Sequence, residues 1–280
     1  MLAYRHLFHA GNFADVFKHA LLARLVLALA RKPKPFCYLD THAGTGRYDL
    51  ADEWARKNAE WRSGIGRVWD RTDAPALLEP YLDAVRAENR GPRLRFYPGS
   101  PRIAGRLARP GDRLVLSELN GADCAALAAR FAHDRRATVH RMDGYQSLRA
   151  HLPPRERRGL VLIDPPYDRA GEFARLVQAL AQAHARFATG VFAVWYPLME
   201  PAAMRAFERD LAATGIRRML RLELAVQSAR WRLGLRGCGL LAVNPPFGFA
   251  DEARAILAWL WPVLAPGGDG GERVDWLTPE

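Results

Sequence analysis

Short apolar segments that alternate with amphipathic ones limit the fold of this chain more than any other feature. Five segments are almost continuously hydrophobic: FCYLD (36–40), RLVLSE (113–118), ATVHRMD (137–143), GLVLID (159–164) and GVFAVWYP (190–197). Strands that are apolar on both faces and are joined by helices are typical of a parallel sheet with helices on both sides. The alternation therefore predicts an α/β fold.

The segments between these strands predict crossover helices. Their apolar residues recur every three or four positions in NGADCAALAARFAHD (120–134), EFARLVQALAQAHARFA (172–188) and EPAAMRAFERDLAATG (200–215). Further on, LRLELAVQ (220–227) and GLLAVNPPF (239–247) flank a basic turn and predict an antiparallel pair. Seven strands with a reversed end give the outline of the Rossmann-like methyltransferase sheet, although an outline alone does not establish activity.

A long segment between the first two strands interrupts the alternation. Four of its apolar residues fall on one helical face: Trp54, Trp61, Ile65 and Val68. We expect a small helical insertion in which the tryptophans serve packing. The predicted organisation is a main domain of residues 1–47 and 98–280 and a helical insertion subdomain of residues 48–97.

The charge of the chain favours polyanionic partners. Lys and Arg number 41 against 30 Asp and Glu, which gives a net charge of +11 and a pI near 10.1. Phosphate neutralisation by basic residues dominates affinity for nucleic acids, so RNA or DNA is a natural partner. The alternative is that an Arg-rich, Ala-rich chain with only four lysines reflects genome composition.

The sequence indicates neither a membrane partner nor a secretory signal. Its longest apolar stretch, residues 20–30, is interrupted by Arg24 and is shorter than the roughly 20 residues that span a bilayer. We expect a buried helix there. Asp15 and Lys18 precede the stretch and RKPK follows it, which argues against a signal peptide and for a cytoplasmic protein.

No metal site is predicted. Cys37, Cys124 and Cys238 lie far apart without CxxC spacing, so we expect reduced packing residues. His6 and His9 have the spacing of metal ligands, but no acid or cysteine partner is near them in the sequence.

Acids and glycines follow the first three strands. Gly44 and Gly46 in DTHAGTG allow φ > 0 and a close approach of a ligand, and the loop does not match the GxGxxG of dinucleotide sites. Glu118 ends the second strand, where an acid typically accepts hydrogen bonds from ribose hydroxyls. Asp143 and Gly144 end the third strand, where an adenine amino group can donate to the acid. Each acid alone is more often a solvated strand end, but three such acids at one edge predict a nucleoside cofactor.

The motif IDPPY after the fourth strand predicts a catalytic corner. Proline rings hold Asp164 extended and leave its carboxylate and the carbonyl of Pro165 as acceptors, with the ring of Tyr167 beside them. Such a set suits an exocyclic amine of a nucleobase, with Asp164 as hydrogen-bond acceptor or general base. A second motif, VNPPF (243–247), competes with it, but the motif follows the final strand and is expected to be a turn.

With DPPY and DTHAGTG in these places, the chain resembles adenine-N6 methyltransferases that use S-adenosylmethionine. The resemblance extends over essentially the whole chain to the bacterial family that methylates one adenine in 23S ribosomal RNA, through MLAYRHLFHAGNFADVFKHALL (1–22), YLDTHAGTGRY (38–48), YPGSP (97–101), RRGLVLIDPPY (157–167), RFATGVFAVWYP (186–197) and DLAATGIRRML (210–220). It implies a monomeric class I methyltransferase with a Rossmann-like fold, S-adenosylmethionine as cofactor and 23S ribosomal RNA as partner.

The resemblance also implies the residues of the site. Asp164 would be catalytic and would touch the cofactor. The other residues implied in cofactor contact lie in matching motifs: Lys18 and His19 in FKHA, His42 in DTHAGTG, Ser100 in PGSP, Glu118 in LSEL, and Asp143 with Gly144 in MDGY. Tyr4, Pro165 and Tyr167 would contact substrate, and Lys18 would help to close the site.

Two alternatives remain open at this point. The same chemistry serves adenine in DNA or a glutamine amide in a protein. A non-enzymatic RNA-binding or assembly factor can also keep the fold. The Arg and Trp residues of the basic turn SARWRLGLRG (228–237) fit either an RNA contact or a solvated surface.

Overall fold

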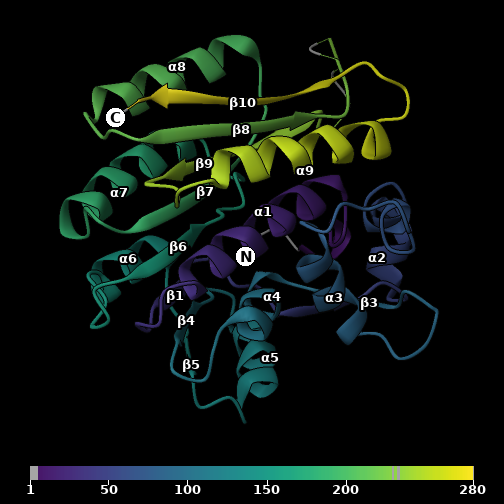
Figure 1. Cartoon of the computed structure of the whole chain (residues 1–280), viewed down its shortest axis with the longest axis horizontal. Helices are drawn as coiled ribbons and strands as arrows, with labels where there is room; N and C mark the ends of the chain where they lie inside the picture. Colours follow the sequence, from purple (N-terminus) through teal and green to yellow (C-terminus); the bar gives the residue numbers. More distant parts are fainter. Residues whose placement is uncertain (1–5, 229, 232–233, 280) are drawn as a thin grey trace.

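The computed structural model describes residues 6–228, 230–231 and 234–279. Its centre is an eight-stranded sheet with the order β10-β8-β9-β7-β6-β1-β4-β5 (Figure 1). In chain order the strands are β1 (Cys37–Asp40), β4 (Arg113–Ser117), β5 (Ala137–His140), β6 (Gly159–Ile163), β7 (Val191–Pro197), β8 (Met219–Ala225), β9 (Gly237–Val243) and β10 (Gly271–Thr278). The predicted Rossmann-like α/β fold is confirmed.

The sheet has one strand more than the seven predicted. Strands β5, β4, β1, β6 and β7 are parallel, and β9 pairs antiparallel with β7 and with β8, as expected for the reversed end. The missed strand, β10, is the outermost strand of the sheet and pairs antiparallel with β8. Its residues are all half-buried or exposed, so it lacks the continuous apolar run that identified the other strands.

Helices cover both faces of the sheet (Figure 1). They are α1 (Phe13–Ala30), α4 (Ser100–Leu107), α5 (Gly121–Phe131), α6 (Gly144–His151), α7 (Glu172–Arg186), α8 (Pro201–Ala213) and α9 (Phe249–Leu264). Alternate residues of a strand pack into different layers, as the pleat requires. In β6, Leu160 and Leu162 face the core that contains α1 and α9, whereas Val161 and Ile163 face the core that contains α6, α7 and α8.

Helix α1 is the buried helix that the sequence predicted. Leu21, Leu22 and Leu25 are at most 1% exposed. Asn12 caps its first turn, because the side chain accepts a hydrogen bond from Asp15 N. In the part of the chain that the structure describes, no helix combines the length and the hydrophobicity needed to cross a membrane. The three cysteines are free and buried.

The segment between β1 and β4 consists of several short pieces. They are β2 (Arg47–Asp49), α2 (Glu53–Asn58), the 3₁₀ turns η2 (Glu60–Arg62) and η3 (Ile65–Arg67), α3 (Glu79–Ala87) and β3 (Phe96–Pro98), with β2 paired to β3. The expectation of one amphipathic helical face was wrong, because Ala59 adopts a left-handed φ of 46° and ends α2. Ile65 and Val68 are buried, whereas Trp54 is 46% exposed.

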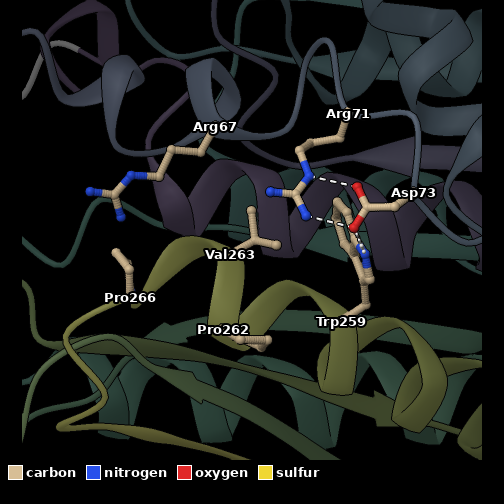
Figure 2. A pocket seen from close by; sticks show the side chains of 7 residues that line it. All are labelled: Arg67, Arg71, Asp73, Trp259, Pro262, Val263 and Pro266. Carbon is tan, nitrogen blue, oxygen red and sulfur yellow. Dashed lines mark hydrogen bonds and ion pairs between the residues drawn. The ribbon is translucent and has the colours of Figure 1, made fainter.

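This segment meets α9 across a cavity of about 490 Å³ (Figure 2). Arg67 donates from Nη1 to Leu264 O at 2.9 Å. Arg71 pairs with Asp73 at 2.6 Å, and its guanidinium group lies 5.6 Å from the ring centre of Trp259. The hydrogen bond of Arg67 and the stacking of Arg71 on Trp259 connect this segment to α9.

Candidate active site

The predicted site residues gather where the parallel strands end. Strands β5, β4, β1 and β6 run in the same direction, so their carboxyl ends share one edge of the sheet. The loops that leave this edge carry His42 after β1, Glu118 after β4, Asp143 after β5 and Asp164 after β6. In open α/β sheets this edge is where ligands bind.

Lys18 connects α1 to Asp164. Its Nζ lies 2.6 Å from Asp164 Oδ2 and 2.9 Å from Asp15 Oδ1, and the Lys18 side chain is 5% exposed. Burial lowers the pKa of Lys18, but the two carboxylates outweigh it and hold the pKa well above its usual value. Lys18 is therefore a buried ammonium group. Among the described residues no donor lies within hydrogen-bond distance of Asp164 Oδ1, which leaves this oxygen for a ligand.

Asp15 is a member of this cluster that the sequence reasoning missed. Its Oδ2 lies 2.9 Å from His6 Nε2 and accepts a hydrogen bond from Gly11 N at 2.9 Å. Burial raises the pKa of Asp15, but the neighbouring His6 and Lys18 outweigh it and hold the pKa well below its usual value. The available signal was its position three residues before Lys18, a spacing at which helical side chains meet.

His19 directly follows Lys18 in α1 and is 1% exposed. Its Nδ1 lies 2.8 Å from the hydroxyl of Tyr97. Its Nε2 is buried and has no hydrogen-bond partner in the described part of the chain. Burial and the charge of Lys18 hold the pKa of His19 well below its usual value, so the ring is neutral. A buried ring nitrogen without a partner is costly unless a ligand pairs with it.

The glycine-rich loop has the predicted conformation. Gly44 and Gly46 have φ of 58° and 78°. Ser100, the first residue of α4, donates to Asp40 Oδ2 at 2.7 Å, and the hydroxyl of Tyr38 donates to the same oxygen at 2.7 Å. Asp40 is fully buried, and this burial raises its pKa to about 6 against the opposing effect of the two hydrogen bonds.

Asp40 should make the stability of the protein depend on pH. Its pKa is about 6 in the folded chain and about 4 when unfolded. Between these values the folded chain binds more protons, so its free energy of unfolding falls as pH rises. Relative to Asp40→Asn, we expect the wild type to lose about 2 kcal/mol between pH 4 and pH 7. Urea unfolding of both proteins across this range measures it; parallel curves would contradict the assignment.

Glu118 and Asp143 shape the loops at the edge. Glu118 Oε2 accepts from Gly44 N at 2.9 Å, which ties the loop after β1 to the end of β4. Burial raises the pKa of Glu118. Asp143 caps α6 by accepting from Tyr145 N at 3.0 Å, and Arg175 Nη2 donates to its second oxygen at 2.9 Å.

His42 and Gly144 lie in direct contact. Thr41 Oγ1 donates its hydrogen to Leu162 O at 3.0 Å. His42 Nδ1 lies 2.8 Å from Thr41 Oγ1, so Nδ1 must donate to that hydroxyl oxygen. Burial lowers the pKa of His42 to about 4, which leaves a neutral ring with Nε2 as an acceptor. A methyl group on Gly144 would lie 2.5 Å from Thr41 O and 2.6 Å from His42 Cε1. The loops after β1 and β5 therefore touch where a side chain does not fit.

The aromatic residue that ends the DPPY motif is held in place by several contacts. Pro165 is buried, and Tyr167 has a left-handed φ of 54°. The Tyr167 hydroxyl donates to Trp195 O at 2.7 Å, and its ring packs against Trp195 and Phe173 at 5.8 and 5.0 Å between centres. These contacts hold Tyr167 next to the ends of β6 and β7.

The second motif, VNPPF, lies at the opposite edge of the sheet. Because β9 is antiparallel, Val243 pairs with Phe192 near the start of β7. Asn244 Nδ2 donates to Ala188 O at 2.8 Å and to Gly190 O at 2.9 Å. The motif therefore forms the strand-ending turn that was expected.

Two predicted features lie wholly or partly outside the described residues. Tyr4 lies outside the described residues, as do residues 229, 232 and 233 of the basic turn. In that turn Trp231 is 38% exposed, and Arg236 donates to Met199 O at 3.0 Å.

The histidines near the N-terminus do have acidic partners, contrary to the expectation from sequence. His6 pairs with Asp15 and His9 with Glu60, which α1 and the inserted segment supply. The two acids are different, so the histidines do not converge. No group of three or more possible metal ligands occurs among the described residues.

Comparisons with known proteins find relatives along the entire chain. The family described as "Ribosomal RNA large subunit methyltransferase D, RlmJ" matches residues 33–278. The chain is 46% identical over 280 residues to "Ribosomal RNA large subunit methyltransferase J" of Escherichia coli K12, with 100% of both chains covered. It is 43% identical over 281 residues to the Haemophilus influenzae protein of the same name, also with 100% coverage of both. The crystal structure of protein LPL1258 from Legionella pneumophila superposes with a TM-score of 0.89 at 37% identity, covering 96% of this chain and 98% of that one.

Proposed function

Because the chain belongs to the RlmJ family of ribosomal RNA large subunit methyltransferases, we propose that it transfers a methyl group from S-adenosylmethionine to the N6 amine of one adenine in 23S ribosomal RNA. The observation that carries the proposal is Asp164, which stands at the ligand edge of the sheet between two prolines and a buried ammonium group. One of its oxygens is left for a donor, and an adenine amine is such a donor.

The residues at the edge fit S-adenosylmethionine. His19 Nε2 is buried and unpaired among the described residues, and the loops after β1 and β5 approach at Gly144 so closely that only glycine fits. Glu118 supplies a half-buried carboxylate for ribose hydroxyls, and Asp143 an acceptor for the adenine amine of the cofactor. The bound cofactor would supply an activated methyl group. We assign Lys18, His19, His42, Ser100, Glu118, Asp143, Gly144 and Asp164 to this site.

The contribution of the chain to methyl transfer is electrostatic and geometric. Asp164 Oδ1 and the carbonyl of Pro165 would accept the two hydrogens of the substrate amine, which turns its lone pair toward the methyl group and stabilises the developing positive charge. Asp164 would then take up the released proton. Tyr167, fixed by Trp195, would present a ring to the substrate base, and Tyr4 would contact the RNA. A stacked base cannot reach this corner, so the adenine must be unpaired or extruded.

The proposal extends to the setting of the reaction. Ribosomal RNA as substrate supports a cytoplasmic enzyme, and one chain supplies every residue assigned to the site, which supports a monomer. We propose that residues 1–47 and 98–280 form the methyltransferase domain and residues 48–97 a subdomain. The net charge of +11 suits a polyanionic substrate.

A competition experiment separates this function from its alternatives. Labelled S-adenosylmethionine is offered with 23S ribosomal RNA, duplex DNA and a protein that carries accessible glutamines. We expect label in RNA alone, recovered as N6-methyladenosine at one position by mass spectrometry of digests. Label in DNA or in protein would reassign the substrate. Absence of cofactor binding in calorimetry would favour a non-enzymatic RNA-binding protein.

Asn244→Ala tests the assignment of the two proline motifs. The substitution removes two hydrogen bonds and places alanine at a φ of 52°, so we expect a loss of about 1–3 kcal/mol in the free energy of unfolding. Methyl transfer per folded molecule should stay at the wild-type rate, because this turn lies at the opposite edge. The measurements are urea unfolding and initial rates; a folded but inactive variant would move the site to VNPPF.

A further inference from the structure

We propose that Asp15 is a positioning residue for methyl transfer, which holds the ammonium group of Lys18 in place beside Asp164. The inference rests on the proposed function. Asp15 is 2% exposed and shares Lys18 with Asp164 at 2.9 and 2.6 Å. Lys18 is thus placed between two carboxylates, one on its own helix and one 146 residues further along the chain.

Asp15 is itself fixed from two sides. Its Oδ1 faces Lys18, while its Oδ2 faces His6 Nε2 and accepts from Gly11 N. Gly11 O in turn accepts from Ile65 N at 2.8 Å, which attaches the same turn to the inserted segment. The side chain of Asp15 therefore cannot follow Lys18, and the position of the ammonium is set by the framework.

The charge of Asp15 determines how strongly Lys18 holds Asp164. With Asp15 ionised, the ammonium has two carboxylate partners and divides its hydrogen bonds between them. Without that charge, Asp164 is the only carboxylate left within reach of the buried ammonium among the contacts of Lys18 that the structure describes. A tighter pair with Oδ2 would draw the carboxylate toward Lys18 and move Oδ1 away from the position that the substrate amine needs. Asp15 therefore keeps Asp164 available without touching substrate itself.

The test is a double-mutant cycle with Asp15→Asn and Lys18→Met, which separates action through Lys18 from a general loss of structure. We expect Asp15→Asn to lower kcat by about 10- to 100-fold, in line with small misplacements at active sites. The Kd for S-adenosylmethionine should stay within about twofold of wild type. Adding Asp15→Asn to Lys18→Met should produce no further fall in kcat. Multiplying effects in the double variant would overturn the proposal.

Asp112→Asn is the matched control. Asp112 is an equally buried aspartate, 2% exposed, that accepts from Phe36 N at 3.1 Å and Arg109 N at 2.7 Å near the amino end of β1. It should lower stability without changing kcat per folded molecule. Equal losses of kcat in Asp15→Asn and Asp112→Asn would show that Asp15 has only a structural role.

A longer side chain serves if Asp15→Asn does not fold. Asp15→Glu keeps the charge but moves it by one methylene, so a displaced Lys18 should again reduce kcat, and wild-type kcat would contradict the inference. The wild type is assayed in parallel on the same RNA. If the wild type transfers no methyl group, the proposed function fails. If the wild type is active and the Asp15 variants have the same kcat per folded molecule as Asp112→Asn, the inference about Asp15 fails.

Discussion

Replacing Asp164 by alanine should reduce methyl transfer by about 10²- to 10⁴-fold, the range associated with loss of a general base or of a preorganised electrostatic partner. The substitution removes both carboxylate oxygens, including the one that has no donor among the described residues. Lys18 keeps Asp15 as its partner at 2.9 Å, so its charge stays compensated. The loss should therefore appear in the chemical step.

The measurement is mass spectrometry of ribosomal RNA digests, combined with calorimetric titration of the cofactor. We expect Asp164→Ala to bind S-adenosylmethionine and to leave the target adenine unmethylated. Asp164→Asn, which keeps one acceptor oxygen, should fall between the wild type and the alanine variant. Undiminished methylation by Asp164→Ala would end the assignment of DPPY as the catalytic motif.

Gly144→Ala should weaken binding of S-adenosylmethionine. The added methyl group would lie 2.5 Å from a backbone oxygen, Thr41 O, and 2.6 Å from His42 Cε1, so the loops after β1 and β5 must separate. Overpacking of this kind costs about 1–3 kcal/mol. If the cofactor site bears the cost, Kd rises by about 5- to 150-fold. Isothermal titration of both proteins measures it.

Gly121→Ala is the control for Gly144→Ala. Both glycines are the first residue of a helix, after the caps Asn120 and Asp143. A methyl group on Gly121 would meet only the end of the Arg141 side chain, at 3.1 Å, and that side chain can move. We expect Gly121→Ala to bind the cofactor like the wild type. Equal affinity of the two alanine variants would contradict the role given to the contact between Gly144 and His42.

The sequence predicted the sheet where its physical signal was strong. Strands β1, β4, β6 and β7 are buried on nearly every residue, and such strands read as apolar runs. Strand β10 is half-solvated and gave no such run. The inserted segment was predicted as helical, but the left-handed turn at Ala59 depends on local backbone energetics that apolar periodicity does not report.

The site was predictable as far as it depends on strand ends. Acids after parallel strands must share an edge, so the common location of Glu118 and Asp164 followed from the strand order, and the DPPY motif singled out Asp164 as the catalytic candidate. Asp15 was not found: its spacing from Lys18 indicates a helical ion pair, but it does not indicate that the pair reaches the candidate site. Its relation to Asp164 runs through Lys18, and no local pattern encodes a contact across 146 residues. The neutral state of His19 likewise depends on burial that only the fold creates.

The Lys18–Asp164 pair has a consequence for the order of events during synthesis. At about 5–20 residues per second, a ribosome makes residue 164 roughly 7–30 s after residue 18. Of its described partners, Lys18 then has only Asp15, and α1 lacks Leu160 and Leu162 of β6, which belong to the core that buries it, so α1 cannot reach its final buried position until β6 has emerged. Helix α1 is thus synthesised early but packs into the core only after β6 has been made. The nascent chain remains inactive until a segment from its second half arrives.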